Sequence, residues 1–335
     1  MVRSAIATLL SLVAFVAWGQ PEEGVNAEAL PEIVSLQKIW DQAAHNAFTD
    51  LIRFHDHWFC TFRESDSHAA GANGKIRIIV SEEGDAWESA ALLTEDGIDL
   101  RDPKLSIMPD GRLMLVAGGS LFADRYLTRA PRVAFSQDGY TWTETTRVLA
   151  EDHWLWRVTW HKGKAFCLSK MGEGPAERRT GYLYTSTDGL NWTWLTEFNV
   201  LGVSETTLRV MPDEEMIALV RPGFIGSSRP PYKDWTFHEI GMKIGGPNFI
   251  RAPDGTLWAA ARRYNLDGSK ETVLARMTKE TYEPVLALPS RGDTSYPGLV
   301  WHEGLLWMSY YSSHEGKASI YLARIRLPLH EPDAE

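Results

Sequence analysis

Cysteine is scarce in this chain, which has two, Cys60 and Cys167, among 335 residues. Each lies inside an apolar run that is typical of a strand, and the two runs occupy matching positions in different repeats. We therefore expect both to be buried free thiols that pack as small hydrophobic groups, with a disulfide as the alternative. The chain has no cysteine and histidine cluster with the spacing of a zinc site, so the sequence predicts neither a metal nor another cofactor.

Runs of basic residues are absent as well. The formal net charge is −10, and the chain has no basic stripe of the kind that binds nucleic acid. It also lacks a polybasic segment that would dock on anionic lipid. These absences exclude nucleic acid and a charged membrane surface as expected partners.

The chain begins with a short apolar segment. Arg3 precedes an apolar stretch at residues 5–17, and small residues follow at the spacing of a cleavage site. This stretch is too short to span a bilayer. We expect residues 1–20 to be a signal peptide that is cleaved near residue 19, which predicts a secreted or periplasmic protein. Residues 21–335 are then expected to form a single domain.

Helical periodicity is nearly absent, and short strand-like runs alternate with glycine, aspartate, asparagine and proline. This pattern is typical of an all-β chain. The motif Ser-x-Asp-Gly-x-x-Trp recurs at residues 136–142 and 186–192, with a degenerate copy at 81–87. A fourth turn, at 233–235, keeps only the tryptophan. The spacing between copies suits four-stranded blades of a propeller.

A second kind of turn, Pro-Asp-Gly or a related sequence, recurs between the first two strands of each repeat. The turns divide the chain into six units: 45–92, 98–147, 152–197, 203–240, 246–286 and 294–327. A strand-like stretch at residues 32–40 precedes the first unit. We expect it to complete the last blade and close the ring, because closure removes exposed sheet edges.

The repeated Ser-x-Asp-Gly-x-x-Trp motif resembles the Asp box (BNR repeat) of the sialidase, or neuraminidase, superfamily and related propellers. The resemblance implies a six-bladed β-propeller with four-stranded antiparallel blades. The Asp box is a structural turn found in propellers of many functions, so it does not by itself imply an activity.

Aligning the six units shows which residues end the second strand of each. They are Arg63, Gly118, Lys170, Arg221, Arg262 and Tyr311. Four cations converging on one axis would repel one another unless an anion lies between them. The pattern therefore predicts a pocket for a carboxylate, to which arginine offers paired hydrogen bonds. The alternative is that long charged side chains simply reach water at strand ends.

Several of these positions are similar to the sialidase active site. Arg221 corresponds to the second arginine of the sialidase triad, and Arg262 to the third. Tyr311 resembles the tyrosine nucleophile, with Tyr310 as its rival. Glu205 resembles the glutamate that takes the proton of that tyrosine. The resemblance implies this pair because a tyrosine hydroxyl, with a pKa of about 10, needs a base beside it to act as a nucleophile.

Two features differ from the sialidase pattern. The first arginine of the triad is missing from residues 47–50, and Arg63 is the available substitute. The positions that align with the acid/base aspartate are not acidic. Asp66 and His68 lie in the same loop and are the candidate general acids, and a histidine needs little tuning for this role at neutral pH.

Other polar residues cluster where the first strands begin, at the same mouth. As substrate-binding candidates we name His45, Asp50, Arg101, Asp102, Arg157 and Tyr296. Each has a structural alternative, such as an ion pair between Arg101 and Asp102. Most of the fourteen tryptophans are expected to fill gaps between sheets, although one at the mouth would stack on a sugar ring.

Together these patterns predict an exported, monomeric, glycan-active enzyme. The favoured activity is a glycoside hydrolase, exo-sialidase-like, that removes a terminal acidic sugar such as sialic acid or a uronic acid. One alternative is a propeller that binds glycans or a protein without catalysis. The other is a polysaccharide lyase acting on uronic-acid glycans, with His45 or His68 as the base.

Overall fold

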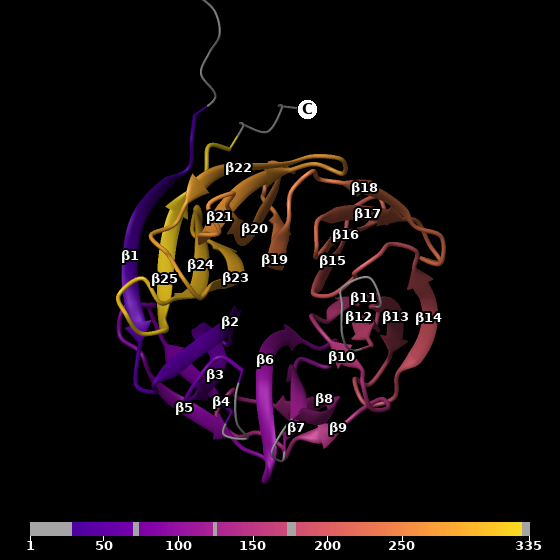
Figure 1. Cartoon of the computed structure of the whole chain (residues 1–335), viewed down its shortest axis with the longest axis horizontal. Coiled ribbons are helices and arrows are strands. Elements are labelled where there is room, and N and C mark those ends of the chain that lie inside the picture. Colours follow the sequence, from indigo (N-terminus) through magenta and orange to yellow (C-terminus); the bar gives the residue numbers. More distant parts are fainter. Residues whose placement is uncertain (1–28, 70–73, 123–125, 173–178, 330–335) are drawn as a thin grey trace, which may run out of the picture.

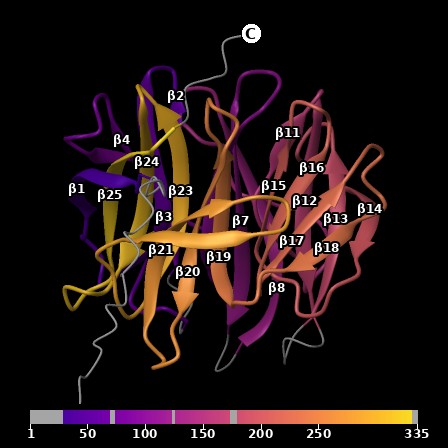
Figure 2. The same ribbon diagram turned by 90° about the horizontal axis from the view of Figure 1, so that it is seen from above.

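Six antiparallel sheets surround a common axis in the computed structural model of the protein (Figure 1). The structure describes residues 29–69, 74–122, 126–172 and 179–329. The predicted signal peptide lies outside these residues. Seen from its edge, the molecule is a disc whose strands run between two faces (Figure 2).

The six sheets are numbered as blades I to VI, and each is given from the axis outward. Blade I contains β2 (His45–Phe54), β3 (His57–Ser65), β4 (Lys75–Ser81) and β5 (Glu88–Leu93). Blade II contains β6 (Ile98–Ile107), β7 (Leu113–Phe122), β8 (Tyr126–Ser136) and β9 (Thr146–Arg147). In blade III the inner strand is split into β10 (Trp154–Leu155) and β11 (Thr159–His161), followed by β12 (Lys164–Met171), β13 (Thr180–Ser186) and β14 (Thr193–Phe198). Blade IV contains β15 (Thr206–Val210), β16 (Met216–Val220), β17 (Phe224–Ser228) and β18 (Thr236–Glu239). Blade V contains β19 (Ile244–Arg251), β20 (Leu257–Tyr264), β21 (Lys270–Met277) and β22 (Tyr282–Ala287). Blade VI contains β23 (Thr294–His302), β24 (Leu305–Ser312), β25 (Ser319–Arg326) and β1 (Glu32–Trp40).

The ring is closed by β1, which pairs antiparallel with β25 from Glu32 opposite Arg326 to Trp40 opposite Ile320. The strand that the sequence placed before the first unit therefore completes the last blade, as predicted. At the junction of blades VI and I, Trp58 stacks on Trp307 with ring centroids 4.2 Å apart.

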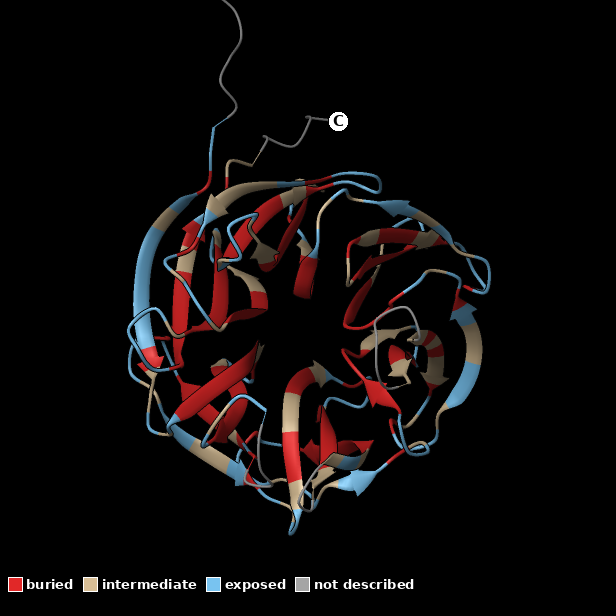
Figure 3. Ribbon diagram, viewed as in Figure 1, coloured by how far each residue is buried: buried red, intermediate tan, exposed pale blue. Residues whose placement is uncertain are grey.

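Burial in each blade decreases from the middle strands to the outer strand (Figure 3). The strand β24 reads Leu-Leu-Trp-Met-Ser-Tyr-Tyr-Ser and is buried along all but its first residue, whereas most of β1 is exposed. A middle strand packs against both neighbouring blades, so its sequence is a continuous apolar run instead of an alternating one. Among the described residues, each pair of neighbouring blades shares a hydrophobic cluster, so the core lies between the blades.

The Asp-box turns form the hydrogen bonds that the motif predicts. The Gly139 N–H donates to Ser136 Oγ at 2.8 Å, and Asp138 Oδ1 accepts from the amides two and three residues later. The Trp142 indole N–H donates to the carbonyl of Gly139 at 2.9 Å. The copy at residues 186–192 repeats this pattern. These turns therefore anchor the outer part of blades II and III and do not take part in the central mouth.

Two further expectations concern cysteine and membranes. Cys60 and Cys167 are buried and free, as predicted. In the part of the chain that the structure describes, nothing resembles a helix of the length and apolarity that crossing a bilayer requires.

Candidate active site at the propeller mouth

A cavity of about 350 Å³ lies at the mouth, on the face where the inner strands begin and the second strands end. Its wall combines aromatic rings with charged side chains of both signs. The rings are Phe48, Phe122, Tyr126, Trp154 and Tyr296, and the ionisable side chains are His68, Arg101, Asp102, Arg129, Lys170 and Glu205. A small polar cavity of this composition suits a ligand with many hydroxyl groups and a charge.

The inner strands carry irregularities that aim side chains into this cavity. Phe48, Asp102 and Tyr296 have positive φ angles of 69°, 52° and 55°, and Gly246 has a φ angle of 58°. Each lies where the pairing of its strand with the second strand of the blade shifts register. Such bulges bend a strand and redirect its side chains, and backbone strain of this kind is concentrated at functional sites.

Tyr296 and Glu205 form the central pair of the cavity wall. The Tyr296 hydroxyl donates to Glu205 Oε1 at 2.7 Å. Arg221 Nη1 lies 2.7 Å from each carboxylate oxygen, and the Gly246 N–H donates to Oε2 at 3.0 Å. A Cβ on Gly246 would lie 2.7 Å from the Tyr296 ring, so this position needs glycine for space as well as for its φ angle.

The charges around this pair fix its protonation. Burial opposes ionisation of Glu205, but the charge and hydrogen bonds of Arg221 and the bond from Tyr296 outweigh burial and lower the pKa of Glu205 to about 2. Burial and the negative charge of Glu205 raise the pKa of Tyr296 well above its ordinary value. The resting pair is therefore a neutral tyrosine beside an ionised carboxylate, which is the arrangement that a general base and its nucleophile need.

Tyr311 takes a different position from the one expected. It is fully buried and does not line the cavity, and its hydroxyl donates to Asp293 Oδ1 at 2.7 Å while accepting from Arg262 at 2.8 Å. The expected pairing of Tyr311 with Glu205 is thus corrected, because the bulge in β23 carries Tyr296 to that carboxylate. Tyr310, the rival, donates to the carbonyl of Pro289.

Arg63, Arg157 and Asp50, all expected to bind substrate, form ion pairs inside the protein. Arg63 is fully buried, and its guanidinium binds Asp99 Oδ1 at 2.7 and 2.8 Å. Arg157 binds both oxygens of Asp50 at 2.7 and 2.8 Å, and both side chains are buried. None of Arg63, Arg157 and Asp50 lines the cavity, so these ion pairs are not available to a ligand in it.

The cations that do line the cavity come from blades II and III. Lys170 Nζ lies 5.7 Å from the centre of the Trp154 ring and has no hydrogen-bond partner among the described residues. Burial and the neighbouring charge of Arg129 lower its pKa to about 8. Arg129 donates to the carbonyl of Gly172 at 3.0 Å, and Arg101 donates to the carbonyl of His68.

Asp102 brings a second carboxyl group to the cavity. Burial raises its pKa, the charges of Arg101 and Lys104 oppose this rise, and the charge of Glu205 adds to it. Its Oδ1 is buried and has no hydrogen-bond partner among the described residues. A carboxyl group with a raised pKa next to an ionised one is the pattern of an acid and base pair.

The histidines and their loop lie on one side of the same cavity. His68 lines it, and His45 and His68 both contact the carboxylate of Asp293. Asp66, the other expected acid, is exposed in the loop after β3 and does not line the cavity.

Tyr296 and Asp102 were predicted only as binding residues, and neither Arg129 nor Tyr264 was singled out from the sequence. A signal for the first two was present: Asp102, Gly246 and Tyr296 each precede a proline at the same place in their repeats. Tyr264, which accepts from Arg221 at 3.3 Å and Arg262 at 3.4 Å, has no comparable repeat signal.

No protein-family model and no curated protein sequence matches the chain. Several solved structures match the chain. A Dyadobacter fermentans protein of unknown function matches with 16% identity and a TM-score of 0.77, over 89% of this chain and 99% of that one. A Trypanosoma rangeli sialidase in complex with the inhibitor DANA matches with 11% identity and a TM-score of 0.67, over 89% of this chain and 59% of that one. A GH93 α-L-arabinofuranosidase of Fusarium graminearum, in complex with arabinobiose, matches with 16% identity and a TM-score of 0.67, over 88% and 98%.

These similarities and the six four-stranded blades define the chain as a six-bladed β-propeller with a sialidase-like fold. The predicted fold class is confirmed. At these identities the likeness extends to the fold alone and does not establish an activity.

Proposed function

We propose that the protein is a glycoside hydrolase that removes a terminal acidic sugar from a glycan. The observation that carries the proposal is the Tyr296 hydroxyl, 2.7 Å from an ionised Glu205, on the wall of a charged cavity. Two of the structurally similar proteins, a sialidase and an arabinofuranosidase, are glycosidases, which supports a glycosidase on this fold.

In the proposed first step, the oxygen of Tyr296 attacks the anomeric carbon while its proton passes to Glu205. A tyrosine suits a sugar whose anomeric carbon carries a carboxylate, because a neutral nucleophile avoids the repulsion that a carboxylate would meet. Arg221 remains bound to Glu205 and keeps that carboxylate ionised until the proton arrives.

Asp102 is the proposed general acid. Its raised pKa keeps the proton available, and it gives this proton to the oxygen of the leaving alcohol as the glycosidic bond breaks. The resulting carboxylate then takes a proton from water, and this water cleaves the bond between sugar and Tyr296. As this bond breaks, Glu205 returns its proton to the Tyr296 oxygen, so the net reaction consumes one water and restores Tyr296, Glu205 and Asp102.

The cations of blades II and III are the proposed site for the acidic group of the sugar. Arg221 and Arg262 already contact Glu205 and Asp293, whereas Lys170 faces the cavity with no hydrogen-bond partner among the described residues. Lys170, with Arg101 and Arg129 around it, supplies the positive charge that an anionic sugar needs. Trp154, under Lys170, offers a ring for the sugar face.

Export remains part of the proposal. The signal-peptide pattern of residues 1–20 would bring the enzyme to glycans outside the cytoplasm, and a mature N-terminus near residue 20 in protein recovered outside the cytoplasm would support it.

Covalent trapping tests the proposed function directly. The purified protein is first assayed on aryl glycosides of sialic acid, a uronic acid and neutral sugars, and then incubated with a fluorinated sugar fluoride of the class it cleaves. We expect turnover of an acidic glycoside and a mass increase of one sugar on the peptide that holds Tyr296. Tyr296→Phe is expected to abolish labelling, and Tyr311→Phe to retain it.

Each alternative has its own outcome in this experiment. Binding of acidic glycans without turnover would favour a non-catalytic propeller. Products with ultraviolet absorbance from a carbon–carbon double bond would favour a lyase. Labelling of the peptide that holds Tyr311 would reject Tyr296 as the nucleophile.

A further inference from the structure

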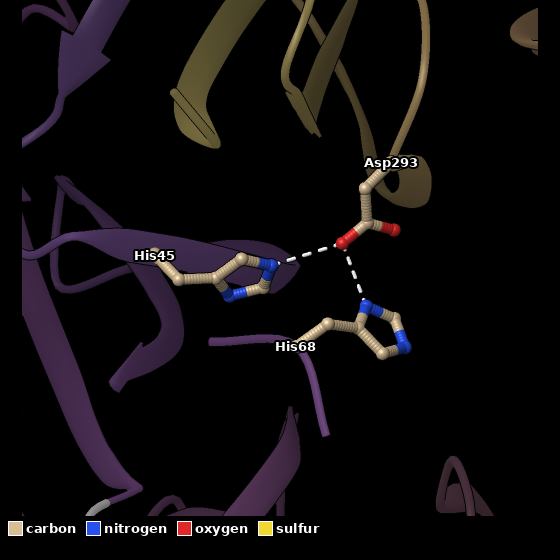
Figure 4. A group of neighbouring side chains, drawn as sticks. All are labelled: His45, His68 and Asp293. Atoms are coloured by element: carbon tan, nitrogen blue, oxygen red, sulfur yellow. Dashed lines mark hydrogen bonds and ion pairs between the residues drawn. The ribbon is translucent and has the colours of Figure 1, made fainter. Parts of the chain in front are cut away.

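Two histidines and one aspartate from distant parts of the chain meet at the edge of the mouth cavity (Figure 4). His45 begins β2, His68 lies in the loop after β3, and Asp293 precedes β23. His45 Nε2 lies 2.9 Å from Asp293 Oδ2, and His68 Nδ1 lies 2.6 Å from the same oxygen. The three atoms all lie within 4.8 Å of one another.

We propose that these three side chains bind a Zn²⁺ ion. Two imidazole nitrogens and one carboxylate oxygen are a ligand set that zinc prefers, with a fourth position left open. Bonds of about 2.0–2.2 Å in a tetrahedron place ligand atoms roughly 3.3–3.5 Å apart, so the two nitrogens need to move away from Oδ2 by less than about 1 Å. His68, whose side chain is about half exposed on a loop, can make the larger part of this movement.

The surroundings of Asp293 support a metal site. Its second oxygen, Oδ1, accepts from the Tyr311 hydroxyl at 2.7 Å and lies 3.4 Å from Arg262 Nη2. Its backbone N–H donates to Ser313 Oγ at 2.9 Å. Hydrogen bonds that hold a ligating carboxylate from behind in this way orient it toward a metal and are a regular part of metal sites.

The remaining ligands are held to different degrees. The His45 ring packs between Phe48 and Tyr311, with centroid distances of 6.2 and 6.4 Å. His68 packs edge-on against the Phe48 ring at 5.1 Å and keeps its outer side in the cavity. The open zinc position would therefore lie on the cavity side.

The charges of this corner determine what the fourth ligand is. Arg262 donates to the carbonyl of Thr294 and to Tyr311, so its charge stays on the Oδ1 side of Asp293. With zinc on the Oδ2 side, the positive charges of the zinc ion and Arg262 exceed the negative charge of the Asp293 carboxylate. The open position therefore favours an oxygen anion. A carboxylate of a substrate in the cavity has this chemistry.

Metal titration tests the site on the resting protein. The protein is stripped with a chelator and titrated with ZnCl₂ in a calorimeter, and we expect about one zinc per chain. His68→Gln should weaken binding by at least about 100-fold, because it removes a direct ligand. Zinc should also raise the unfolding temperature of the native sequence, since it links blades VI and I, and should not raise that of His68→Gln.

His161→Gln is the matched control. His161 Nε2 lies 3.0 Å from Glu214 Oε2, so this pair has the same contact without a second histidine. The control should bind zinc as tightly as the native sequence. Zinc binding that is absent from the native sequence, or that survives both His68→Gln and His45→Gln, would overturn the proposal. The readout involves no turnover, so either result leaves the proposed hydrolase to its own test.

Discussion

Two cavities on opposite faces of the propeller differ in what surrounds them. The mouth cavity has a volume of about 350 Å³, and a cavity between blades IV and V on the other face has about 600 Å³. The larger one is lined by apolar side chains, by the turns that connect first to second strands and by charged side chains, the last being Asp213, Arg251, Arg276, Lys279 and Glu283. Neither volume nor the presence of charged side chains therefore sets the mouth cavity apart, whereas its backbone conformation and the burial of its ion pairs do.

Positive φ angles serve different purposes on the two faces. On the far face Glu214, with a φ angle of 67°, lies in a hairpin turn where the chain has to reverse. At the mouth Phe48 and Tyr296 have such angles inside strands, where reversal is not needed. Because the positive φ angles of Phe48 and Tyr296 do not serve to reverse the chain, they indicate that these side chains have to be positioned at the mouth.

Charges differ between the faces in the same way. The pair of Arg229 and Asp213, beside the far cavity, is more than half exposed. The pair of Arg63 and Asp99, behind the mouth, is completely buried. Buried charges are costly to maintain unless they are paired, so their concentration at the mouth indicates that this face is constrained more tightly than the other.

The largest effect is expected from Glu205→Gln, which keeps the shape of the side chain but removes the base. We expect kcat to fall by about 10⁴-fold, because the Tyr296 proton then has no acceptor. Tyr296→Phe should give a loss of similar size while leaving Arg221 paired. Steady-state kinetics on the best aryl glycoside measures both, and turnover within tenfold of the native rate in both variants would contradict the proposed pair.

Asp99→Asn is expected to have the next largest effect, on stability. It leaves the buried guanidinium of Arg63 without its charge partner, which costs about 3–5 kcal/mol of the free energy of unfolding. Urea denaturation measures the change. The double variant with Arg63→Met should recover part of the loss, and an equal loss in both would show that the ion pair is not the cause.

Asp102→Asn should reduce kcat by about 100-fold on a substrate with a poor leaving group and much less on an activated aryl glycoside. A general acid has to be protonated, so native kcat should fall as the pH rises through the raised pKa of Asp102. The variant should lose this alkaline decline. If the decline persists in Asp102→Asn and disappears in His68→Gln, His68 is the acid.

The fold was largely predictable from the sequence because blade repeats are local patterns. Turn motifs, apolar middle strands and the spare strand at 32–40 each predict their own element. Glu205 was found because it lies in a regular position, one residue before β15. Tyr296 was not assigned as the partner of Glu205, because a bulge breaks the two-residue alternation on which a strand alignment depends.

The charged contacts were less predictable for a related reason. Arg63 and Arg221 end equivalent strands. Arg63 nevertheless forms a fully buried ion pair with Asp99, whereas Arg221 binds Glu205, which lines the cavity. Which acid meets which cation depends on contacts between blades, and the repeat pattern describes positions within one blade.

Lys170→Met is expected to raise KM for an acidic glycoside by about tenfold and to leave KM for a neutral one unchanged. The lysine binds an anion only when protonated, and its pKa is lowered to about 8. In the native protein KM for the acidic substrate should therefore rise as the pH increases through about 8. An equal effect on neutral and acidic substrates would place the anion elsewhere in the cavity.

The smallest effect is expected on the far face, from Asp213→Asn. Asp213 Oδ2 lies 2.7 Å from Arg229 Nη2, which is as short as the contact of Arg63 with Asp99, but both partners are exposed to water. Water and salt screen an exposed pair, so its loss should leave the unfolding temperature, kcat and KM unchanged. Thermal unfolding at low and high salt, together with the kinetic assay, measures this. A clear loss of turnover would mean that the larger cavity contributes to the activity after all, and that burial of the charges at the mouth does not by itself identify the site.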